Sequence, residues 1–159
     1  RARLMLKPLA LFLLTATAVF AQDAPVLAEY WTDSGSLPPE YAWETTVTIL
    51  DDGALTLKHC KGYETEGPAC KTRRATVPED ALAAIRTAAA ESGLANKPAR
   101  EAEFPMVGGG LTGGLVYVDG QKVKLLSQPA EADVQRVGKV LAAIAAAIPP
   151  RFDRFIDPD

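Results

Sequence analysis

Val47-Thr-Ile-Leu-Asp-Asp-Gly-Ala-Leu-Thr-Leu57 is the stretch that decides the fold. Apolar and polar residues alternate on both sides of Asp51-Asp52-Gly53, which is typical of two strands joined by a turn. A two-residue loop would mix the apolar and polar faces of the two strands. A three-residue loop with Gly53 in the left-handed conformation instead sets Ile49 opposite Leu55 and keeps one face apolar. The sequence therefore predicts a β-hairpin with a three-residue loop.

Residues 1–21 have the layout of a secretory signal peptide, with basic residues first, an apolar run over 9–20 and then Ala21 before polar residues. The apolar run is shorter than the roughly 20 residues that a membrane span needs. We expect cleavage after Ala21, with residues 16–18 as a second possible site. The expected location is periplasmic or secreted, with no membrane span after cleavage.

The charge of the chain argues against one class of partner. Residues 1–21 hold three of the 17 basic residues and none of the 20 acidic ones, so the remainder carries a net charge of −6. Nucleic acid is therefore not expected as a partner, because binding to phosphates requires a basic surface. The remaining length suits one domain with its own core.

The strand that leaves the first hairpin runs into the only two cysteines, Cys60 and Cys70, and contains the only histidine, His59. The hairpin register sets Thr45 opposite His59, so we expect a half-buried, structural histidine on the apolar face. In an exported chain the two cysteines are expected to form a disulfide. Closing so short a loop predicts a stabilisation of about 2.5 to 3 kcal/mol.

The rest of the chain contains one more hairpin and two helices. An irregular lead-in is expected over residues 22–42, before a single domain over 43–159. A helix is expected between Thr76 as its N-cap and Gly93 as its stop. A second hairpin turns at Asp119-Gly120 and sets Val116 opposite Val123, and a helix with an apolar stripe follows over 129–148. The sequence predicts an α+β fold, an antiparallel sheet built from two β-hairpins, each followed by an amphipathic helix packed on one face.

Gly108-x-Gly110-x-x-Gly113 has the letters of a dinucleotide-binding motif. The segment leads into a strand, whereas that motif must lead into a helix whose N-terminus meets the phosphates. No cofactor is therefore expected. The segment 108–114 is expected to form a bend before the second hairpin, or a mobile loop beside a binding face.

A single histidine leaves few options for catalysis or metal binding. No serine lies in a nucleophile elbow, and one imidazole with scattered carboxylates is a poor ligand set once both cysteines are oxidised. We therefore expect no catalytic residue and no metal site. One alternative is a hydrolase of unfamiliar type that uses His59 or a carboxylate pair such as Glu64 and Glu66. A second alternative is a structural protein of the cell envelope.

The loop between the cysteines and the residues after it form a locally basic segment. Five basic residues lie within residues 58–74, against two acidic ones. A bridged loop is preorganised for docking, and tyrosine and arginine are common at interface hot spots. We predict a partner-binding surface made of six residues: Lys61, Tyr63, Glu64, Lys71, Arg73 and Arg74.

A disulfide-pinned loop with histidine and lysine beside the cysteine, here within residues 58–70, resembles the protruding loops of small periplasmic lysozyme inhibitors. Those loops insert into an active-site cleft, so the resemblance implies an inhibitor-like module. The sequence thus predicts a small exported binding module without catalysis, whose partner is a protein or another cell-envelope component.

Overall fold

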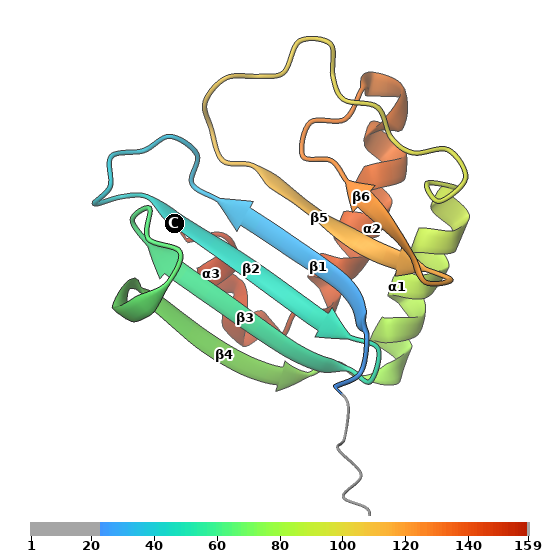
Figure 1. Ribbon diagram of the computed structural model, residues 1–159, viewed down its shortest axis with the longest axis horizontal. Helices are drawn as coiled ribbons and strands as arrows, with labels where there is room; N and C mark the ends of the chain where they lie inside the picture. Colours follow the sequence, from blue (N-terminus) through green and yellow to red (C-terminus); the bar gives the residue numbers. More distant parts are fainter. Residues whose placement is uncertain (1–22, 159) are drawn as a thin grey trace, which may run out of the picture.

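The computed structural model describes residues 23–158, and the expected signal peptide over 1–21 lies outside them. One six-stranded antiparallel sheet runs through the molecule in the order β4-β3-β2-β1-β5-β6 (Figure 1). The α+β fold class predicted from the sequence is confirmed. The strands are β1 (Val26–Asp33), β2 (Trp43–Leu50), β3 (Ala54–Lys61), β4 (Cys70–Thr76), β5 (Thr112–Val118) and β6 (Gln121–Leu125).

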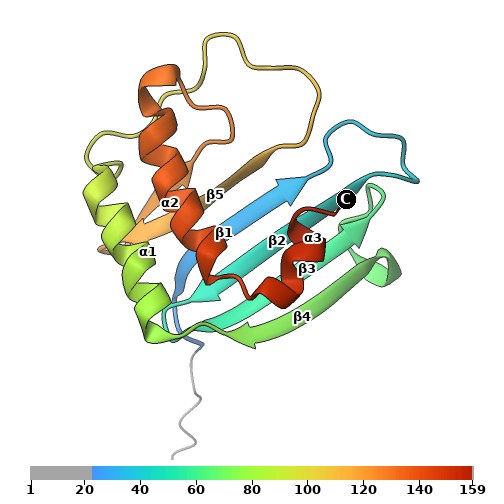
Figure 2. The same ribbon diagram turned by 180° about the vertical axis from the view of Figure 1, so that it is seen from behind.

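The helices cover one face of this sheet and leave the other face open (Figure 2). They are α1 (Glu79–Ser92), α2 (Val134–Ala147) and the short α3 (Asp153–Ile156). Between sheet and helices lies the core, in which Val47, Ile49, Leu55 and Leu57 are at most 1% exposed. The core therefore forms where the apolar face of the first hairpin meets the helices.

The register predicted for the first hairpin is confirmed. Ile49 pairs with Leu55, and Thr45 pairs with His59. The turn over 51–53 has three residues, and Gly53 has the positive φ, +91°, that this loop requires. In the second hairpin Val116 pairs with Val123, also as predicted.

The irregular lead-in expected over residues 22–42 is wrong for its first half. Residues 26–33 form β1, a central strand that pairs with β2 on one side and β5 on the other. Ala28, Tyr30 and Thr32 alternate toward the core, but the bulky Trp31 lies on the opposite face, and a bulge shifts the register between Val26 and Ala28. These two features hide the period of two in the sequence.

The expected start of the first helix is also wrong. Thr76 is not an N-cap, because it ends β4 and pairs with Ala54. The helix starts at Glu79, directly after Pro78. Its predicted end is confirmed, since Gly93 follows the helix in the left-handed conformation at φ +65°. Strand β4 therefore occupies residues expected to be loop.

Candidate binding surface

Two loops, 34–42 between β1 and β2 and 62–69 between β3 and β4, gather at one end of the sheet with the later part of the long loop 93–111 between α1 and β5 (Figure 1). We call this end the loop surface. The described residues expose seven large apolar side chains, and six of them lie in these loops. The six are Leu37, Tyr41, Tyr63, Phe104, Met106 and Val107.

Hydrogen bonds brace the three loops against one another. The Tyr63 hydroxyl donates to the carbonyl of Leu37, which joins the disulfide-closed loop to the β1–β2 loop. The Asp33 carboxylate accepts from the backbone N–H of Gly35 at 2.7 Å and of Leu111 at 3.2 Å, which joins the β1–β2 loop to the long loop. The loop surface is therefore preorganised, so docking on it costs little ordering entropy.

The glycines of the segment 108–114 allow backbones to approach closely. A Cβ on Gly110 would lie 2.5 Å from the carbonyl oxygen of Asp33, and a Cβ on Gly35 would lie 2.1 Å from that of Gly109. On the open face of the sheet, a Cβ on Gly113 would lie 2.6 Å from the indole of Trp31. The segment is thus a packing element that holds two loops together, in a place where larger residues do not fit.

The base of the long loop is anchored by a buried carboxylate. Asp133, only 4% exposed, accepts from the backbone N–H of Arg100 at 3.0 Å and from the Arg136 guanidinium at 2.7 Å. The hydrogen bond from Arg100, followed by the bond and charge of Arg136, lowers the pKa of Asp133. Farther along the loop, the side-chain amide of Gln128 bonds both the N–H and the carbonyl of Met106.

A cavity of about 280 Å³ opens between the loops. Its wall combines apolar and polar groups, which is usual for a recognition site. The lining includes Trp43, Tyr63, Met106, Asp33, Glu44 and Gln128.

Asp33 and Glu44 are cavity residues that the sequence analysis did not single out. They pair across β1 and β2. The carboxylate pair suggested from sequence, Glu64 and Glu66, lies in the exposed loop instead, and Glu66 is 3.6 Å from Lys58. Knowing that β1 lies beside β2 would have placed Asp33 next to Glu44. The sequence pattern did not show β1, so this pair could not be predicted.

His59 is enclosed by aromatic rings on the helix-covered face. Its ring centroid lies 6.0 Å from that of Trp43 and 5.3 Å from that of Phe155. The Thr45 hydroxyl donates its one proton to the carbonyl of Phe155, so it must accept the 2.7 Å bond from Nδ1 of His59. Burial, and then the charge of Lys61, lower the pKa of His59. Burial therefore favours the neutral imidazole, and its Nδ1 is held by Thr45.

The six residues predicted to bind a partner lie on three different elements. Tyr63 and Glu64 lie in the 62–69 loop, Lys61 is the last residue of β3, and Lys71, Arg73 and Arg74 lie on β4. The loop and β4 meet at the disulfide, which joins Cys60 and Cys70, two residues paired directly across β3 and β4. The bond closes the 61–69 loop and starts the new strand at the same point.

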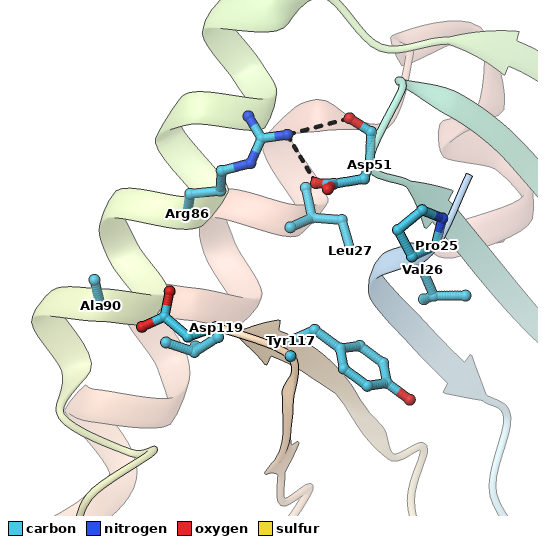
Figure 3. A pocket seen from close by; sticks show the side chains of 10 residues that line it. Pro25, Val26, Leu27, Asp51, Arg86, Ala90, Tyr117 and Asp119 are labelled. Atoms are coloured by element: carbon cyan, nitrogen blue, oxygen red, sulfur yellow. Dashed lines mark hydrogen bonds and ion pairs between the residues drawn. The ribbon is translucent and has the colours of Figure 1, made fainter.

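A larger hollow, of about 460 Å³, lies at the opposite end of the sheet (Figure 3). Among the described residues that line it, only Arg86 is cationic. Its guanidinium bonds the Asp51 carboxylate at 2.8 Å, the Asp51 carbonyl at 3.1 Å and Glu79 at 2.9 Å. The hydrogen bond to Asp51 is the main cause of a raised pKa of the Arg86 guanidinium, and the hydrogen bond to Glu79 raises it further. Arg86 therefore ties α1 to the first hairpin turn and is not available to a ligand.

Residues 23–158 contain neither a cluster of metal ligands nor a membrane-spanning helix. No group of three or more histidine, cysteine or acidic side chains comes together there in a way that could hold a metal ion. None of the helices in this part of the chain is long and apolar enough to cross a membrane. Neither a comparison with protein-family models nor a search of curated proteins finds a match to this chain.

Proposed function

We propose that this chain is a small exported binding module, without catalysis, that recognises a protein or another cell-envelope component through its loop surface. The observation that carries the proposal is the concentration of exposed apolar side chains on loops that are braced by hydrogen bonds and a disulfide. Contiguous exposed apolar side chains mark interaction sites, and rigid loops bind at low entropic cost.

Export is supported by the leader pattern of residues 1–21 and by the disulfide. A bonded cysteine pair is compatible with an oxidising location outside the cytoplasm. A role without catalysis is supported by His59, which is 9% exposed and hydrogen-bonded within the fold. A general base must lie within reach of a substrate proton, and burial keeps the imidazole away from solvent.

Site-specific photocrosslinking tests the binding proposal. A photoreactive phenylalanine analogue is placed at position 63 and, as the control, at position 134. Among residues 23–158, Val134 is the one exposed large apolar side chain outside the loop surface. In cell-envelope fractions we expect a crosslinked adduct from position 63 and none from position 134. The adduct should weaken when Phe104 is changed to Asp. Equal adducts from both positions, or none from position 63, would contradict the proposal.

Two further experiments test the hypothesis of an inhibitor-like module and the alternative of a hydrolase. The purified protein is titrated against lysozyme, and an inhibition that Tyr63→Ala relieves would identify the partner class. It is also assayed against generic esterase, peptidase and glycosidase substrates. Turnover that disappears in His59→Gln or in Glu44→Gln would replace the binding proposal with a catalytic one.

A further inference from the structure

The arginines of the described chain divide into two groups. Arg86, Arg100 and Arg136 form ion pairs with carboxylates. Within residues 23–158 no ion pair involves any of the other four, which are Arg73, Arg74, Arg151 and Arg154. All four lie on β4 or on the segment of α3 and the turn before it. An otherwise acidic protein thus gathers its uncompensated guanidinium groups in one region.

Cation–π contacts hold three of these guanidinium groups over aromatic rings. Arg73 and Arg154 lie 5.4 Å and 4.8 Å from the centroid of the same ring, that of Phe155. Arg151 lies 4.9 Å from the ring centroid of Phe152. A guanidinium in a cation–π contact still has N–H donors that can bind a carboxylate through two hydrogen bonds.

Strand β4 is an edge of the sheet, because its only neighbour is β3. Its residues 71–74 are all exposed. Lys71 and Arg73 pair with the buried His59 and Leu57, so they lie on the helix-covered face, and Arg74 lies on the open face. Figure 2 shows β4 along the rim of the sheet, with α3 over the strands beside it. The edge thus offers unpaired backbone groups with cations on both faces.

We infer that the edge of β4 accepts an acidic, extended polypeptide segment of a partner as an additional strand. The backbone of that segment would pair with β4, as in other cases of strand addition. Its alternate side chains would point to one face, where carboxylates meet Lys71, Arg73 and Arg154. The charge selects an acidic segment and rejects a basic one. This surface is separate from the loop surface and does not rest on the function proposed for it.

The test uses a fluorescein-labelled peptide of alternating glutamate and threonine, with fluorescence anisotropy as the readout. Two matched peptides serve as comparisons, one with glutamine for glutamate and one with N-methylated backbone at alternate residues. We expect binding of the first peptide only, weakened by salt because the interaction is ionic. In Arg73→Glu and, separately, in Arg154→Glu, we expect binding to weaken by roughly tenfold or more.

Lys122→Glu combined with Lys124→Glu is the control, because it reverses two charges on the other edge strand, β6. We expect this variant to bind like the wild type. Equal binding of the N-methylated peptide would overturn the inference, since it would show attraction to a polyanion without strand pairing. Binding to vesicles of phosphatidylglycerol in the absence of any peptide binding would overturn it as well, and so would binding unchanged in both arginine variants.

Discussion

His59 links the stability of the fold to pH. Its pKa in the folded protein is below the ordinary value of 6.5, chiefly because the imidazole is buried. At a pH between the folded-state and the unfolded-state pKa of His59, the unfolded chain therefore binds more protons than the folded protein. The free energy of unfolding thus falls as pH drops through about 6.5. The loss ends below the folded-state pKa, where both states are protonated.

His59→Gln tests this linkage, because glutamine keeps an N–H donor for Thr45 and does not titrate. We expect the free energy of unfolding to fall less in the variant than in the wild type between about pH 7.5 and pH 5.5. Urea denaturation at each pH measures the difference. Identical pH dependences would mean that the histidine is not the group responsible.

Two glycines offer a comparison of close packing with open space. In Gly113→Val, the new side chain would displace the indole of Trp31, and we expect a loss of about 1 to 3 kcal/mol in the free energy of unfolding. A Cβ at Gly138, in the middle of α2, meets nothing within 4 Å, so Gly138→Ala should stabilise by about 0.5 to 1 kcal/mol. Denaturant titration of both variants measures the two free energies of unfolding. A Gly113→Val variant as stable as the wild type would contradict the close packing of Gly113 on Trp31.

At the scale of elements, the disulfide fixes where β4 begins. Changing both cysteines to alanine should lower the free energy of unfolding by about 2.5 to 3 kcal/mol, because the unfolded chain regains the entropy of the open loop. Hydrogen exchange should show the largest loss of protection in β4, which has only β3 as a neighbour. A uniform loss over all strands would argue that the bond stabilises the sheet as a whole.

Elements could be predicted from the sequence where one face is buried and the other is polar. The hairpin around Asp51-Asp52-Gly53 satisfies this condition, and its register was predicted residue by residue. Strand β4 does not, because an edge strand with exposed side chains shows no alternation of apolar and polar residues. Strand β1 fails for a different reason, since Trp31 places a large apolar ring on the open face. Tertiary context, and not local propensity, makes both of these strands.

At the scale of the whole molecule, the candidate site depends on strand order. The cavity at the loop surface needs β1 beside β2, since Asp33 and Glu44 meet only through that pairing. The sequence pointed to Tyr63 in the disulfide-closed loop, but the apolar residues of the long loop join it only through the fold. The sequence also did not predict that Tyr63 and Arg73 lie on different elements, because strand β4 was not predicted.

The placement of the disulfide also bears on how this protein can diversify. Because the bond joins two directly paired residues, the register of β3 and β4 is set at the cysteines and not by the residues between them. Those residues can therefore change in composition and length at little cost to the sheet, since loop-closure entropy grows only slowly with length. We therefore expect the segment between Cys60 and Cys70 to accept new recognition sequences while the sheet keeps its register.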